Sequence, residues 1–214
     1  MKYGFNPSNL DGTEVIIDEV LENMDIPKEY NYKNFLPKAH DQGNDQTCVP
    51  HAISAFVDWY NGVNSINKDM SINWIYDCRE DKDSEGMSLK EALKYIKNVG
   101  YITPQEYKDI KKGETPELVQ INMYGMLKSE FAMQRSLLVN GPFILALPVY
   151  DSNRPDFWNG NNFEGGHAVA CVGYNKEGLI IRNSWGSFWG YNGYCTLPYS
   201  ELYKMYEAWA LIKY

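Results

Sequence analysis

The hydrophobic pattern of this 214-residue chain changes at Pro142, and this change constrains the fold more than any other feature. Before Pro142, apolar residues recur at helical spacing, most clearly from Val49 to Tyr60, where they share one face. After it, Gly, Asn and Pro separate short apolar or aromatic runs, which is typical of strands. These runs are 143–147, 168–172, 179–181, 194–197 and 208–212. A helical half followed by a β half predicts an α+β protein with two lobes.

Four helices are expected in the first two thirds of the chain. The first begins near Cys48, accepts Pro50 because it falls in the first turn, and ends at Asn61-Gly62. A second, short helix runs from Ser71 to Cys78, and a fourth from Ser129 to Val139. The third begins with a capping box formed by Ser88 and Glu91 and ends at Gly100.

Charge and composition exclude several classes of protein. The net charge is −8, and a surface this acidic disfavours binding to nucleic acid, which needs clustered Lys and Arg. No run approaches the roughly 20 apolar residues that span a membrane, and no signal peptide is evident at Met1 to Pro7. Four cysteines are few for a secreted disulfide scaffold, so we expect a cytoplasmic or other reducing compartment, with secretion left open. Neither Cys-x-x-Cys nor paired-His spacing is present, so no metal site is expected.

Three residues have the chemistry of a thiol-based site. Cys48 opens a helix, where the helix dipole and a nearby imidazolium lower a thiol pKa; the alternative is a buried structural cysteine. His167 follows Gly165-Gly166 at the start of an expected strand, although a lone His in such a position is more often structural. The amide oxygen of Asn183 is suited to accept the imidazole N–H and orient the ring, and Trp185 to shield that bond from water.

Together these residues resemble the papain family of cysteine peptidases. Gln42 precedes Cys48 by six residues, His167 stands in His-Ala-Val, and Asn183 stands in Asn-Ser-Trp-Gly, in the chain order of that family. The resemblance covers residues 26–214 and implies a papain-like two-lobe fold: a helical lobe over about 26–125, an antiparallel β-barrel-like lobe over about 126–214, and an active-site cleft between them. Residues 1–25 form an extension with little structure of its own.

The resemblance also implies roles for individual residues. Cys48 is the nucleophile, His167 its proton partner, Asn183 the residue that orients His167, and Gln42 a donor to the oxyanion. Substrate would contact Gly86, Gly166, Ala168 and Trp185. The implied activity is hydrolysis of peptide bonds in peptides or proteins by a monomeric endopeptidase that needs no cofactor. Two alternatives stay open: an acyl transferase with the same triad, such as a transpeptidase, and a catalytically silent binding protein.

Departures from the family concern its disulfides. Asp45 stands where the family usually has a cysteine, and Cys78 has no counterpart in the following forty residues. The chain therefore resembles the disulfide-poor bacterial and viral branch. Cys171 and Cys195 lie on expected strands, where two buried thiols are favoured over a bridge.

The extension has two interpretations. It lies in the cleft and inhibits the enzyme until displaced or cut, as a short pro-segment would, or it only packs on the surface.

Overall fold

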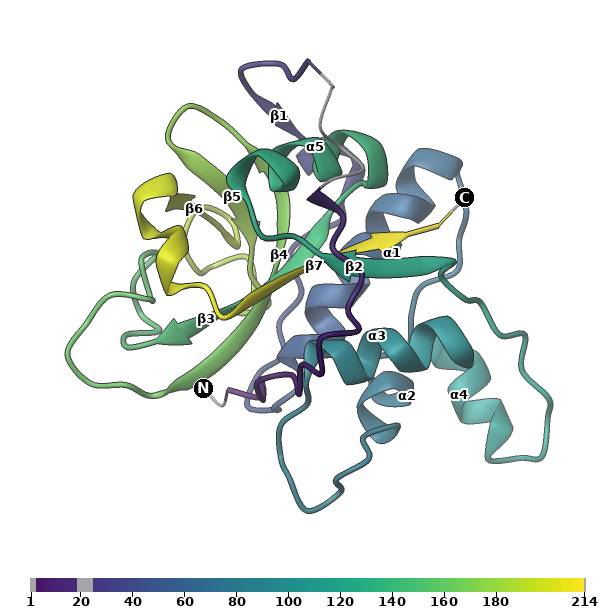
Figure 1. Cartoon of the computed structure of the whole chain (residues 1–214). Coiled ribbons are helices and arrows are strands. Elements are labelled where there is room, and N and C mark those ends of the chain that lie inside the picture. The colour runs from purple at the N-terminus through teal and green to yellow at the C-terminus, as the bar shows by residue number, and fades with distance from the viewer. Residues whose placement is uncertain (1–2, 19–24, 214) are drawn as a thin grey trace.

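The computed structural model describes residues 3–18 and 25–213. Its helices are α1 (Cys48–Asn64), α2 (Ile72–Asp77), α3 (Leu89–Asn98), α4 (Pro104–Ile110) and α5 (Glu130–Asn140), with short 3₁₀ turns at Lys33–Phe35 and Tyr199–Lys204. Its strands are β1 (Tyr30–Asn31), β2 (Met123–Met126), β3 (Phe143–Val149), β4 (Gly165–Tyr174), β5 (Gly178–Arg182), β6 (Tyr194–Pro198) and β7 (Glu207–Ile212). Figure 1 shows α2, α3 and α4 gathered on one side of the molecule and most of the strands on the other. This is the expected α+β, papain-like arrangement.

The strands form an antiparallel sheet that, within the described residues, has seven members. Its order is β2-β7-β3-β4-β5-β6, and β1 pairs with the far end of β4. Every residue of β3 is buried, so the centre of the sheet is covered on both faces. The five strands expected after Pro142 correspond to β3 through β7, whereas β1 and β2 lack a long apolar run and were not predicted.

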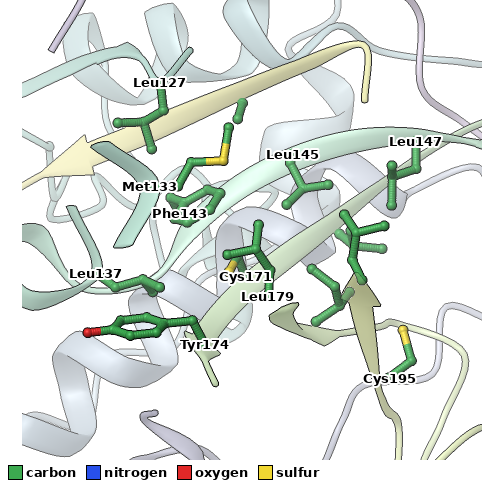
Figure 2. Close-up of a cluster of buried hydrophobic side chains, with 14 of the residues drawn as sticks. Leu127, Met133, Leu137, Phe143, Leu145, Leu147, Cys171, Tyr174, Leu179 and Cys195 are labelled. Atoms are coloured by element: carbon green, nitrogen blue, oxygen red, sulfur yellow. The ribbon is translucent and has the colours of Figure 1, made fainter. Parts of the chain in front are cut away.

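Alternate residues of the central strands enter two different cores. Phe143, Leu145 and Leu147 face one core together with Leu137 of α5, as Figure 2 shows. Ile144, Ala146, Ala168 and Trp209 face the other, where they meet α1 and α3. The second core holds the thiol-bearing end of α1, so packing of α1 against β3 and β4 positions the candidate site.

The structure differs from the helix predictions at the end of α1 and at α4. Gly62 does not end α1; the helix continues to Asn64 and stops at Ser65, whose φ is 55°. Gly62 serves a close contact instead, because a Cβ there would meet the Phe35 carbonyl oxygen at 2.4 Å. The α4 helix was missed, although Thr103 and Glu106 form a full capping box and Pro104 occupies its first turn.

All four cysteines are free. Cys171 on β4 and Cys195 on β6 both pair with Ile181 of β5, which lies between them, so they are buried thiols rather than a bridge. Over residues 3–18 and 25–213, we find no helix with the length and apolar character needed to cross a membrane.

Candidate active site

The candidate nucleophile is the first residue of α1. Cys48 is fully buried, and its N-cap residue Thr47 makes no side-chain capping bond. N–H groups of a first helical turn have no acceptor inside the helix, so those of Cys48 and Val49 point outward from its end. Both act on the thiol, as does the backbone N–H of Ala168. Ala168 directly follows His167, so the sulfur lies against the segment of β4 that bears the histidine.

His167 is held rigidly. It pairs with Leu147 in the sheet and is fully buried. The Trp185 ring stacks on the imidazole at a centroid distance of 4.5 Å and an interplanar angle of 23°. Phe157 meets the imidazole edge-on at 5.8 Å. These two contacts fix the plane of the ring, and Trp185 provides the shielding that the sequence predicts.

Asn183 determines which nitrogen of His167 carries the proton. Its Oδ1 lies 2.7 Å from the backbone N of Ser184 and 2.7 Å from His167 Nε2. A backbone N–H only donates, so the shared atom must be the amide oxygen, and the neutral imidazole must be protonated at Nε2. His167 Nδ1 then carries the lone pair. Nδ1 is buried and makes no hydrogen bond within the described part of the chain.

Gln42 is joined to the segment that bears Asn183. Its backbone N donates to Ser184 O at 2.8 Å, and Ser184 Oγ donates to its Oε1 at 2.6 Å. Its Nε2 donates to Asp45 O at 2.8 Å. Ser184 therefore orients both Asn183 and Gln42, a role that was missed although the Asn-Ser-Trp-Gly run contains this residue.

Burial sets the protonation of the thiol and imidazole. It raises the pKa of Cys48 to about 11, against the opposing effect of the neighbouring backbone N–H groups. It lowers the pKa of His167 to about 4, although the bond to Asn183 acts in the opposite direction. The sequence predicts a depressed thiol pKa from the helix N-terminus and a nearby imidazolium. In the structure desolvation outweighs that effect, so both groups are neutral at neutral pH.

Part of this burial comes from residues 3–8, which we call the arm. The Tyr3 ring lies edge-on to His167 at 6.4 Å, and its hydroxyl donates to Glu164 at 2.6 Å. The backbone N–H of Gly4 is among the groups that act on the Cys48 thiol. Figure 1 shows this purple segment passing between the strands and the α2–α4 side of the molecule.

The arm also pairs with backbone on both sides of Cys48. Met87 N donates to Gly4 O at 2.8 Å, and Asn6 N donates to Met87 O at 2.9 Å. Phe5 N donates to Gly166 O at 3.3 Å. The Phe5 ring is only 5% exposed and stacks on Tyr206 at 5.6 Å.

The residues expected to contact substrate therefore lie around the arm or at the thiol that the arm covers. Gly166 bonds the arm, Trp185 lies beside Tyr3 at 6.2 Å, and Ala168 lies at the thiol. Gly86 lies against the Asn6 side chain, whose Oδ1 would be 2.4 Å from a Cβ at that position. The backbone groups that pair with the arm belong to the next residue, Met87, which was not predicted to lie at the site.

No group of three or more His, Cys, Asp or Glu side chains suited to a metal ion occurs in residues 3–18 and 25–213.

The fold and site define a two-lobed α+β protein with a buried thiol, an oriented imidazole and an amide partner. The sequence matches the model of the papain family cysteine proteases over residues 22–207, and the chain belongs to this family. It is 30% identical to papaya proteinase 4 of Carica papaya over 199 residues, covering 81% of this chain and 56% of that protein. It is 28% identical to an uncharacterized peptidase C1-like protein of Acanthamoeba polyphaga mimivirus, covering 80% of this chain and 56% of that one. The chain thus spans about half the length of these relatives.

A solved structure supports the fold. Xylellain, a cysteine protease from Xylella fastidiosa, superposes with a TM-score of 0.80 over 99% of this chain and 96% of its own, at 21% identity.

The protonation state of Cys48 is directly testable. We expect no thiolate absorbance from Cys48 at neutral pH in the full chain, because the pKa of about 11 keeps the thiol protonated. The measurement is the ultraviolet difference spectrum between the wild type and Cys48→Ala across pH. A Cys48-dependent thiolate band that titrates on the acid side of neutrality would contradict the structure.

Proposed function

We propose that this protein is a cysteine-type endopeptidase that cleaves peptide bonds through an acyl-enzyme intermediate. The observation that carries the proposal is the bond between His167 Nε2 and Asn183 Oδ1, which leaves Nδ1 as the only ring atom able to take a proton. That acceptor belongs to the residue before Ala168, whose N–H meets the Cys48 thiol. These contacts support the roles of Cys48 as nucleophile, His167 as base and Asn183 as the group that orients the base.

The proposed reaction has two stages. The Cys48 proton moves to His167 Nδ1, and the thiolate attacks the carbonyl carbon of a peptide bond. The carbon–nitrogen bond then breaks, His167 gives its proton to the leaving amine, and a thioester on Cys48 remains. His167 then takes a proton from water as the water oxygen attacks the thioester carbon. The carbon–sulfur bond breaks, the acid product leaves, and His167 gives the proton to the Cys48 sulfur.

Two donors are proposed for the oxyanion. One is the backbone N–H of Cys48, which the first turn of α1 leaves without a helical acceptor. The other is the side-chain amide of Gln42, whose orientation is fixed because Ser184 Oγ donates to its oxygen. Fixed donors of this kind stabilise charge that develops only in the transition state.

The proposal predicts different losses for two substitutions. Cys48→Ala abolishes hydrolysis of a fluorogenic peptide, because no nucleophile remains. Gln42→Ala lowers kcat by about 10²–10³, the cost of one oxyanion donor. Cys78→Ala, which changes a thiol outside the site, leaves hydrolysis unchanged. Full activity in Cys48→Ala, with folding verified by circular dichroism, would refute Cys48 as the nucleophile. No hydrolysis by the wild type or by a chain lacking residues 1–25 would refute the peptidase proposal.

We further propose that the arm occupies the substrate site without being cleaved. Attack requires the sulfur to lie above the plane of a carbonyl group, whereas an N–H donor holds its acceptor near the amide plane. Within the arm, the group that contacts the Cys48 thiol is the backbone N–H of Gly4. The Gly4 carbonyl oxygen instead accepts a hydrogen bond from Met87 N. The arm therefore forms hydrogen bonds with the thiol and the neighbouring backbone, but it presents no carbonyl carbon in a position for attack.

The same contacts suggest how substrate binds. A peptide that replaces the arm would pair with the backbone of Met87 and Gly166, and a side chain in the place of Phe5 would lie on Tyr206. A large apolar or aromatic side chain fits that position.

One added methyl group tests the inhibitory arm. A Cβ on Gly4 would lie 1.9 Å from the backbone oxygen of Gln46, so Gly4→Ala cannot bind in place. We expect Cys48 to react at least about tenfold faster with a peptide-like epoxide, equivalent to about 1.4 kcal/mol of lost arm binding. The measurement is adduct mass on intact protein over time.

The matched control is Gly12→Ala, in the same N-terminal segment. Nothing lies within 4 Å of a Cβ there, so the backbone strain of alanine at a φ of +83° is the only cost of this substitution. Its labelling rate should equal that of the wild type. Unchanged rates in both Gly4→Ala and a chain lacking residues 1–25 would show that the arm does not limit access.

A further inference from the structure

A network of polar side chains lies on the face of α1 that continues from Cys48. His51, Ser54 and Asp58 follow at intervals of three to four residues, so they lie on one side of the helix. His51 Nδ1 is 3.3 Å from His40 Nδ1, and Ser54 Oγ is 3.1 Å from the same nitrogen. The network thus begins one helical turn from the thiol.

The network ends beside Asn183. The Arg182 guanidinium donates to Asp58 at 2.7 Å, and His40 Nε2 lies 3.4 Å from the same carboxylate oxygen. Arg182 also donates to Lys38 O at 3.0 Å. Arg182 directly precedes Asn183 and its side chain is almost fully buried, so this ion pair fixes the backbone from which Asn183 projects.

A small cavity separates the network from Asn183. Its volume is about 10 Å³, measured as the space open to the centre of a water-sized sphere, which is sufficient for one water. Its lining includes His40, His51, Ala55, Arg182 and Asn183. A cavity with this many polar groups is suited to hold water, whereas empty cavities are apolar.

Two of the residues that line this cavity each carry a buried N–H group without a hydrogen-bond partner among the described residues. Asn183 is 2% exposed, and its Nδ2 makes no hydrogen bond to any described residue. The Nε of Arg182 is likewise buried and unpaired over residues 3–18 and 25–213. Leaving a buried donor unsatisfied is costly, so both groups call for an acceptor.

The histidines supply the complementary lone pair. Burial lowers the pKa of His51 to about 3, and the positive charge of Arg182 and the rings of His40 and His167 act in the same direction. Burial also lowers the pKa of His40, against the attraction of Asp58 and Asp69. Both rings are therefore neutral at neutral pH, and a neutral imidazole has one nitrogen that accepts.

We propose that this cavity binds one water molecule, which accepts from Asn183 Nδ2 and Arg182 Nε and donates to the His51–His40 pair. His51 is thereby a positioning residue, since it holds the water that holds the amide of Asn183. The water would fix the nitrogen end of the amide whose oxygen end His167 and Ser184 already bind. The binding site stands on the geometry alone; its effect on catalysis rests on the proposed peptidase function.

A crystal structure of the full wild-type chain tests the water directly. We expect one ordered water within about 3.2 Å of Asn183 Nδ2 and of a ring nitrogen of His51 or His40. A cavity without density in a map that resolves other buried waters would overturn the inference.

Two substitutions at one position test the positioning role. His51→Phe keeps a flat ring but offers no acceptor, so kcat for peptide hydrolysis should fall by about tenfold with KM unchanged, the size expected when a buried donor loses its partner. His51→Gln keeps an acceptor and should retain both the water and kcat. Melting temperatures and circular dichroism establish that each variant is folded.

The outcomes separate this inference from the proposed function. Equal kcat in His51→Phe and the wild type would overturn the positioning role. If His51→Phe does not fold, a His51→Gln variant that keeps kcat without a water at Asn183 would overturn it as well. If the wild type and a chain lacking residues 1–25 are both inactive while the water is ordered, the peptidase proposal is refuted and the water site stands.

Discussion

Packing of the first turn of α1 against β4 is the contact on which the rest of the site depends. It buries Cys48 in the same core as Ala146 and Ala168, and so sets the thiol beside the strand residue that follows His167. The helical lobe contributes the sulfur and the β lobe contributes the imidazole. Neither lobe alone contains both groups, so the proposed chemistry requires that these two surfaces be buried against each other.

Around that contact, hydrogen bonds fix the orientation of the side chains of the site. Asn183 Oδ1 accepts from both His167 and Ser184, which fixes the tautomer of the imidazole. Ser184 extends the same network to Gln42, and the Asp58–Arg182 pair anchors the preceding residue to α1. A buried pair of this kind is costly to break, because loss of one partner leaves an unpaired charge. These bonds orient the side chains without a substrate, as the proposed electrostatic stabilisation of the oxyanion requires.

Much of this arrangement could be predicted from the sequence, for reasons that are local. The cap at Ser88, the helices expected from Ser71 and Ser129, and the apolar runs after Pro142 depend on neighbouring residues, and the structure has these elements at those places. Gly62 was misjudged because its role is a tertiary contact with Phe35. The direction of the Cys48 pKa shift was misjudged because a helix N-terminus is visible in sequence, whereas burial beneath a distant segment is not. The pairing of Met87 with Gly4 could not be predicted, since it joins residues more than eighty positions apart.

We propose that Cys48, His167 and Asn183 form one peptidase site that the arm covers. A crystal structure of the full chain after reaction with a peptide-like epoxide tests this arrangement. We expect a covalent bond to Cys48 Sγ, inhibitor backbone paired with Met87 and Gly166, residues 3–8 displaced, and the His167–Asn183 bond intact. A structure with the arm unmoved and the adduct on another cysteine would contradict it.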